Sequence, residues 1–251
     1  MIMLKNRTVL VTGGSRGIGK ACVELFLKAG ANLAFTFLNA EESTNRTVKN
    51  YKGDSKIISC KVDISDAEKI KNCVEQIVSE FGGIDILVNN AGIWKEASIE
   101  KMSLKEWDET LNINLRSAYL FTKFVVPQMK LNLYGRIVNV ASTAGQRGEA
   151  LHSHYAASKG GMISFTKSLA AELGEFNITV NCVAPGWVYT DMTKKSLGEK
   201  ACFEKVIGDI PLKKIAQPEE IAGPILFLAS DLASHITGEI LNVNGGSVLC
   251  G

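Results

Sequence analysis

The chain has 251 residues, of which 46% are hydrophobic and 22% charged, a composition typical of a globular protein with a large core rather than a disordered chain. Its net charge of +2 is too small to indicate nucleic acid or a membrane surface as a partner. No apolar stretch approaches the ~20 residues that a membrane-spanning helix needs, and segment 1–4 is too short for a secretory signal.

The cysteines and histidines predict neither disulfides nor a metal site. The six cysteines are scattered without a Cys-x-x-Cys pair, so we expect reduced thiols in a cytoplasmic protein. They are Cys22, Cys60, Cys73, Cys182, Cys202 and Cys250. His152 and His154 form a His-x-His pair, but no acidic or cysteine cluster accompanies them, and we predict no bound metal.

The first predicted element is a short apolar strand that runs into a glycine-rich loop. Residues 8–12 read Thr-Val-Leu-Val-Thr, which is typical of a buried parallel strand. The loop Gly13-Gly14-Ser15-Arg16-Gly17-Ile18-Gly19 follows, and a helix is predicted over 17–29. Such a loop lets a pyrophosphate approach the backbone and the free N–H groups of the helix. The spacing Gly-x3-Gly-x-Gly leaves an ordinary tight turn as the alternative, but the strand, loop and helix in this order favour a dinucleotide site.

Apolar strand segments and amphipathic helix segments alternate along the rest of the chain. We predict strands over 8–12, 32–37, 56–62, 84–89, 135–141, 178–183 and 239–243. We predict helices over 17–29, 40–51, 66–82, 104–132, 154–175, 199–207 and 218–231. Pro127 is expected to bend or interrupt the helix over 104–132. This alternation predicts an α/β fold, with a parallel sheet and helices on both of its faces, in a single domain over 1–251.

Polar or glycine-containing segments follow four of the predicted strands. Asp63 follows the third strand, the Asn-Asn-Ala-Gly run at 89–92 the fourth, Ser142 the fifth and the Pro-Gly pair at 185–186 the sixth. In open parallel sheets, ligands bind beyond the carboxyl ends of the strands. The sequence therefore predicts one active site at this edge of the sheet.

Tyr155 and Lys159 lie four residues apart in a predicted helix, which places a phenol and an ammonium on one face. A free tyrosine has a pKa of about 10, and a neighbouring cation lowers that pKa. Ser142 could then hold a substrate oxygen beside the phenol. An exposed pair on the helix surface is the alternative that this spacing alone leaves open.

Taken together, these motifs resemble the short-chain dehydrogenase/reductase (SDR) family. The matching pieces are Thr12-Gly13-x3-Gly17-x-Gly19, Asp63, Asn89-Asn90-Ala91-Gly92, Asn114, Ser142, Tyr155-x3-Lys159 and Pro185-Gly186-x-Val188-x-Thr190-Asp191. They extend to Val243-Asn244-Gly245-Gly246, and the chain is most similar to the 3-oxoacyl-[acyl-carrier-protein] reductases of fatty acid biosynthesis. The resemblance implies a single Rossmann-fold domain with a seven-stranded sheet, and an oxidoreductase that forms a homotetramer in the cytoplasm.

The resemblance also implies catalytic roles for Ser142, Tyr155, Lys159 and Asn114. Tyr155 would be the general acid in reduction or the base in oxidation. Lys159 would lower the Tyr155 pKa and hold the nicotinamide ribose, while Ser142 would bind the substrate carbonyl oxygen. Asn114 would hold a water that connects Lys159 to solvent. A buried amide that bridges backbone groups is the alternative for Asn114, and Asn112 is its rival in the sequence.

A larger set of residues is implied to bind the dinucleotide. They are Gly13, Ser15, Arg16, Gly17, Ile18, Gly19, Asp63, Ile64, Asn90, Ala91, Gly92, Tyr155, Lys159, Pro185, Gly186, Val188 and Thr190. Asp63 would accept a hydrogen bond from the adenine amino group, although a helix cap is the alternative for this carboxylate. Asn90 and Gly92 would contact the adenosine ribose.

The end of the second strand indicates NADP(H) rather than NAD(H). Relatives that use NAD place a carboxylate there, whereas this chain has Phe37, Leu38 and Asn39. Arg16 stands where relatives that use NADP carry a basic residue, and a guanidinium is suited to a phosphate.

The substrate implied by the resemblance is a ketone, in particular a 3-oxoacyl thioester, that is reduced to a secondary alcohol. Leu133 and Phe176 stand where carrier-protein reductases have arginines, so coenzyme A thioesters, small ketones and oxidation of sugar-derived alcohols stay open. We expect segment 191–212 to cover the substrate. The pocket-wall candidates are Trp94, Gln146, His152 and Trp187. A non-catalytic NADP-binding sensor would be expected to have lost the tyrosine or the lysine, and both are present.

Overall fold

The computed structural model describes residues 2–39, 41, 44, 48–49, 51 and 53–249. The strands are β1 (Thr8–Val11), β2 (Asn32–Phe37), β3 (Ile57–Lys61), β4 (Ile86–Asn89), β5 (Gly135–Val140), β6 (Ile178–Pro185) and β7 (Ile240–Val243). The described α-helices are α1 (Gly17–Lys28), α3 (Ala67–Phe81), α4 (Leu104–Leu111), α5 (Ser117–Leu131), α6 (Thr143–Arg147), α7 (Ser153–Leu173), α8 (Lys194–Gly198), α9 (Lys200–Asp209) and α10 (Pro218–Leu228). The helix predicted over 40–51 lies largely outside the described residues, and Cys250 lies entirely outside them.

The strands form one parallel sheet in the order β3-β2-β1-β4-β5-β6-β7. The chain places β2 and β3 on one side of β1 and then returns to place β4 on the other side. This reversal opens a crevice at the carboxyl ends of β1 and β4, which is where open parallel sheets bind ligands. The predicted fold class is confirmed.

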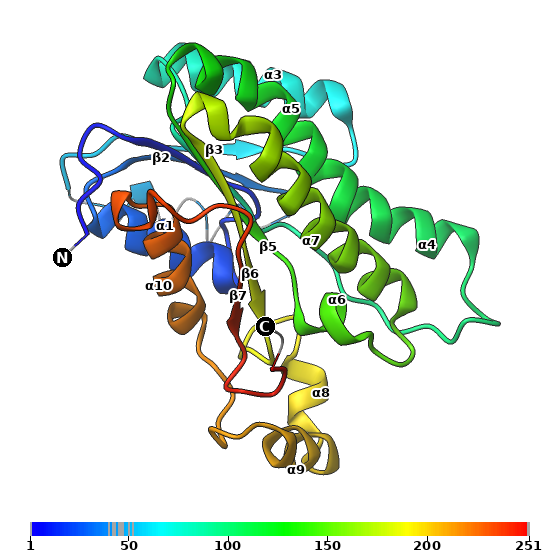
Figure 1. The fold of residues 1–251 in the computed structure, drawn as a ribbon. Helices are drawn as coiled ribbons and strands as arrows, with labels where there is room; N and C mark the ends of the chain where they lie inside the picture. Colours follow the sequence, from blue (N-terminus) through cyan, green and yellow to red (C-terminus); the bar gives the residue numbers. More distant parts are fainter. Residues whose placement is uncertain are drawn as a thin grey trace.

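Helices cover both faces of the sheet because alternate residues of each strand point to opposite faces. Val9 and Val11 of β1 are buried in the core beneath α1 and α10. Leu10, between them, is buried in the core beneath α3, α5 and α7. Figure 1 shows these two helix layers on either side of the sheet, with α8 and α9 beyond the carboxyl ends of β6 and β7. The continuous apolar run of β1 is therefore explained by burial on both sides.

The main departure from the predicted elements lies in the segment 104–132. The chain forms α4, then a π-helical turn (Asn112–Arg116), then α5. Pro127 does not interrupt the helix, because α5 continues through it to Leu131, and a bend at this proline stays a prediction. Two helices of only one or two turns, α6 and α8, were not predicted, since such short helices leave no periodic apolar pattern. None of the described helices has both the length and the apolar character needed to cross a bilayer.

Candidate active site

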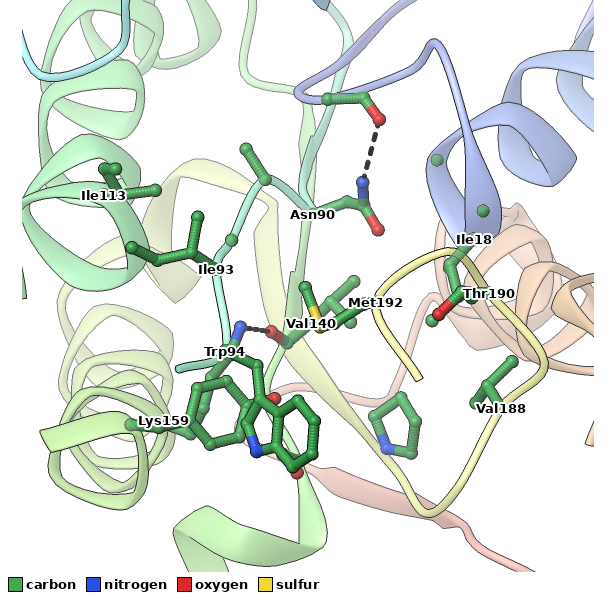
Figure 2. A pocket seen from close by; sticks show the side chains of 18 of the residues that line it. Ile18, Asn90, Ile93, Trp94, Ile113, Val140, Lys159, Val188, Thr190 and Met192 are labelled. Atoms are coloured by element: carbon green, nitrogen blue, oxygen red, sulfur yellow. Dashed lines mark hydrogen bonds between the residues drawn. The ribbon is translucent and has the colours of Figure 1, made fainter. Parts of the chain in front are cut away.

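A cavity of about 440 Å³ lies at the carboxyl edge of the sheet. Every residue that the sequence predicts for dinucleotide binding lines it, from Gly13 in the first loop to Thr190 after β6. Ser142, Tyr155 and Lys159 line it as well, whereas Asn114 does not. Figure 2 shows Asn90, Ile18 and Thr190 at one end of this cavity, with Trp94 and Lys159 towards the other. The structure thus brings all of the predicted site residues except Asn114 together in one cavity.

The glycine-rich loop is held against the end of β2. The Gly13 N–H donates to the Thr36 hydroxyl at 3.1 Å and the Gly14 N–H donates to the Thr36 carbonyl at 2.9 Å. A Cβ at Gly19 would lie 2.1 Å from the Gly13 carbonyl oxygen, so only glycine fits there. No described side chain caps the N-terminus of α1, which leaves its first N–H groups free to meet an anion. Loop and helix terminus together form a cradle that suits a pyrophosphate.

Asn90 fixes the position of the loop after β4. Its amide nitrogen donates to the carbonyl oxygens of Thr12 at 2.9 Å and Gly13 at 3.3 Å. The Thr12 hydroxyl accepts from the N–H groups of Asn90 and Ala91, each at 3.0 Å. The Asn90 amide nitrogen is therefore used to join two cavity loops, a function that the sequence did not reveal. Its predicted contact with the adenosine ribose stays a prediction.

Asp63 is not the cap of the following helix. Asp66 fills that role, since its side chain accepts from the N–H groups of Glu68 and Lys69 at the start of α3. Asp63 instead accepts from the hydroxyl of Ser65 at 2.7 Å and from its N–H at 3.0 Å, and these bonds lower the pKa of Asp63. An ionised carboxylate thus lines the cavity, and it can accept a further hydrogen bond from an adenine amino group.

Ser142 lies directly before α6, and Tyr155 and Lys159 lie on α7, the next helix along the chain. Ser142 is the N-cap of α6 and accepts from the Ala144 N–H at 3.1 Å. Tyr155 and Lys159 are one turn apart on α7, and the Lys159 Nζ lies 5.8 Å from the centroid of the Tyr155 ring. The alternative of an exposed surface pair is excluded, because Lys159 is buried and both side chains line the cavity.

The pKa of Tyr155 changes in the direction opposite to our prediction. Burial raises the pKa of Tyr155 to about 12, although the hydrogen bond from Ser142 opposes that rise, and the charge of Glu149 adds to it. Burial also lowers the pKa of Lys159 to about 8. The Lys159 ammonium donates to the Val140 carbonyl oxygen at 2.7 Å. Desolvation of the phenolate is therefore the largest effect on the Tyr155 pKa, and it outweighs the hydrogen bond from Ser142.

Asn114 is buried and joins the loop after β4 to α7. Its amide oxygen accepts from the Ile93 N–H at 2.8 Å, and its amide nitrogen donates to the Ile93 carbonyl and the Ser158 hydroxyl, both at 3.0 Å. The alternative of a buried amide that bridges backbone groups is thus confirmed. The π-helical turn places this side chain, and a water-holding role for Asn114 stays a prediction.

The pocket-wall candidates divide into two groups. Trp94 and Trp187 line the cavity, whereas His152 and Gln146 do not. Sequence reasoning missed other lining residues on the same loops, among them Arg147, Glu149 and Met192. Their position between Ser142 and Tyr155, or just after the sixth strand, was the available signal. Among the described residues, no group of three or more potential ligands could hold a metal ion.

Comparison with known proteins identifies the family. A family model described as enoyl-(acyl carrier protein) reductase matches residues 13–247. The 3-oxoacyl-[acyl-carrier-protein] reductase FabG of Thermotoga maritima is 42% identical over 247 residues, which is 98% of this chain and 99% of that protein. The chain belongs to the short-chain dehydrogenase/reductase family. The predicted membership is confirmed over nearly the whole chain.

Two solved SDR structures resemble the chain over its full length. The glucose/ribitol dehydrogenase of the family from Brucella melitensis superposes with a TM-score of 0.91 at 36% identity, covering 99% of both chains. A putative NAD(P)-dependent gluconate 5-dehydrogenase from Beutenbergia cavernae, with bound NADP, superposes with a TM-score of 0.93 at 33% identity, covering 98% of both chains. SDR proteins are oxidoreductases that use a nicotinamide cofactor, which suits the cradle formed here.

Proposed function

We propose that the chain is an NADP(H)-dependent reductase that converts a ketone, in particular a 3-oxoacyl thioester, to a secondary alcohol. The proposal rests on one observation: Ser142, Tyr155 and Lys159 line the same cavity as the glycine-rich loop. The names of the curated relatives, which are 3-oxoacyl-[acyl-carrier-protein] reductases at about 40% identity, support the substrate class.

The chemistry follows from the positions of these three groups. A bound nicotinamide supplies the hydride, and the protein supplies the proton and the contacts of the carbonyl oxygen. The Ser142 hydroxyl and the Tyr155 phenol line the same cavity, where both can bind one carbonyl oxygen atom. A pKa of about 12 keeps the Tyr155 phenol protonated at neutral pH, which is the state that a proton donor to the carbonyl oxygen must have.

The direct test is NADPH consumption with acetoacetyl-coenzyme A. We expect loss of NADPH absorbance that depends on the ketone, and no loss with crotonyl-coenzyme A, which has the alkene that an enoyl reductase would need. Reduction of crotonyl-coenzyme A alone would overturn the proposal in favour of the activity in the family model's description.

Oxidation of a sugar-derived alcohol is the second candidate, because two similar structures are described as glucose/ribitol and gluconate dehydrogenases. It is separated from the first by supplying ribitol or gluconate with NADP⁺. The larger of the two kcat/KM values shows which of the two substrate classes the enzyme prefers. A non-catalytic sensor has less support, since Tyr155 and Lys159 both line the cavity.

The residues at positions 133 and 176 do not favour docking of an acyl carrier protein. Leu133 is 59% exposed, and Phe176 lies beneath the Lys130 ammonium at 4.4 Å, so neither position offers an arginine to an acidic carrier protein. We therefore place coenzyme A thioesters ahead of carrier-protein thioesters as the substrate.

We also propose a homotetramer. Exposed apolar side chains on α4 and α5, such as Leu104 and Tyr119, support this proposal, because such helix faces can pack against another subunit.

We propose that Arg16 selects NADPH. Its exposed guanidinium lines the cavity and forms no ion pair with a described residue, while the lining residues 36–39 at the end of β2 include no carboxylate. Arg16→Ala is expected to lower kcat/KM for NADPH by about 10–100-fold, because a charge-assisted hydrogen bond to the 2′-phosphate is lost. The kcat/KM for NADH should stay within about twofold.

Lys20→Ala is the matched control, since it removes a cation on α1 that does not line this cavity. Steady-state kinetics with both cofactors give all the values. An equal loss with NADPH and NADH in Arg16→Ala would contradict the assignment of the phosphate to this residue.

We expect the kcat/KM for NADPH to fall as the pH rises through about 8, because the free enzyme loses the Lys159 charge there. Tyr155, with a pKa of about 12, stays protonated over the same range. Deprotonation of Lys159 does not itself destabilise the fold: its lowered pKa makes the folded state bind fewer protons than the unfolded chain between about 8 and 10.5, so this group adds stability as the pH rises. A pH–rate profile with thermal melting at each pH checks this. A flat profile to pH 9 would contradict it.

A further inference from the structure

Trp94 is held in one orientation by three side chains around it. Its indole stacks on the His152 ring, with centroids 4.4 Å apart and planes inclined by 2°. Its Nε1 donates to a Glu149 carboxylate oxygen at 3.3 Å. The Trp187 ring meets it edge-on, at a centroid distance of 5.9 Å and an angle of 82°. Stacked and edge-to-face pairs of this kind each add to the stability of the arrangement.

The groups that hold Trp94 are themselves fixed. His152 is buried, and its Nδ1 lies 2.9 Å from the Ala150 carbonyl oxygen, which sets the orientation of the ring. The backbone directly before Trp94 is fixed too, since both polar groups of Ile93 bond to the Asn114 amide. The indole can therefore move only if a ring stack and a hydrogen bond break together.

This rigid side chain belongs to the wall of the substrate half of the cavity. Trp94, Glu149 and Trp187 line the same cavity as Ser142 and Tyr155. They come from three loops, after β4, between α6 and α7, and after β6. In the view of Figure 2 the indole lies on the Lys159 side of the cavity, away from Val188 and Thr190.

We propose that Trp94 limits the length of one of the two carbon chains attached to the substrate carbonyl, so that ketones in which this chain is short are preferred. This inference rests on the proposed function, because Ser142 and Tyr155 must first fix the carbonyl oxygen. With that atom fixed, a carbon chain directed towards Trp94 meets an indole whose orientation is fixed by its contacts. Each methylene beyond the available length then has no space in the pocket, and exclusion of one methylene changes kcat/KM by about 10–200-fold.

The test compares kcat/KM for the N-acetylcysteamine thioesters of 3-oxobutanoate, 3-oxohexanoate and 3-oxodecanoate in the wild type, Trp94→Ala and Trp94→Phe. We expect the wild type to favour the shortest substrate by about tenfold or more. Trp94→Ala should raise the ratio of the longest to the shortest substrate by at least about tenfold. Trp94→Phe keeps an aromatic wall without the Nε1 donor, and it should keep most of the wild-type preference. Thermal melting and NADPH affinity verify the fold of each variant.

An unchanged ratio in Trp94→Ala, or a wild type indifferent to length, would overturn the inference. If Trp94→Ala does not fold, Trp94→Leu replaces it, with the same ratio as readout. The same measurement with diketones from butane-2,3-dione to decane-2,3-dione separates the proposed length limit from the proposed thioester substrate. Reduction of short diketones alone, without any thioester, rejects the thioester substrate and supports the length limit. Absence of turnover in both series rejects the ketone reductase itself, and the length limit with it.

Discussion

Tyr155→Phe is expected to lower kcat for ketone reduction by about 10²–10⁴-fold, the range that a positioned general acid contributes. The substitution removes only the phenolic oxygen, and the ring keeps its place on α7 at the edge of the cavity. NADPH affinity should therefore change by less than about threefold, because most of the cradle lies at the glycine-rich loop. Steady-state kinetics give kcat, single-turnover stopped-flow reduction gives the rate constant of the chemical step apart from product release, and fluorescence titration gives the affinity.

Tyr119→Phe is the matched control, since Tyr119 is an exposed tyrosine on α5 that does not line the cavity. It should retain the wild-type kcat. If Tyr155→Phe also retains kcat to within tenfold, the proton comes from elsewhere, and the assignment of Tyr155 as the acid is wrong. A loss of kcat together with a comparable loss of NADPH affinity would instead make Tyr155 a binding residue.

The strands and loops of this fold were predictable because each is indicated by residue types within one short segment of the sequence. The β-branched run at 8–12 gave β1 to within one residue, and the glycines after it marked a turn that the structure needs for steric reasons. Polar residues after successive strands predicted the edge at which the cavity lies, because topology alone places the carboxyl ends of parallel strands together. These predictions required no knowledge of contacts between distant residues.

Features that depend on three-dimensional surroundings could not be predicted. The pKa of Tyr155 follows from burial, and spacing along a helix indicates only that Lys159 is near. The π-helical turn that carries Asn114 has no signature in the apolar pattern, because the helix periodicity continues on both sides of it. Trp94 was recognisable as a wall candidate, but the stack that fixes it joins two loops far apart in the sequence.

The close contact between α6 and α7 leads to the second large expected effect. A Cβ at Gly145 would lie 2.6 Å from the carbonyl carbon of Lys159 and 2.8 Å from the Gly160 nitrogen. Both are backbone atoms, so Gly145→Ala must push α6 away from α7. Ser142 caps α6 while Tyr155 and Lys159 belong to α7, and this contact therefore sets the distance between the groups that bind the carbonyl oxygen.

Gly145→Ala is expected to lower kcat by about 10²-fold, since a misplacement near 1 Å is enough for such a loss. Overpacking should also cost about 1–3 kcal/mol in the free energy of unfolding. Gly174→Ala at the end of α7 is the control, because a Cβ there meets no atom within 4 Å and the backbone is right-handed. Kinetics below the melting temperature and denaturant titration check both values. A destabilised Gly145→Ala enzyme with full kcat would mean that the spacing of α6 and α7 does not position Ser142 for catalysis.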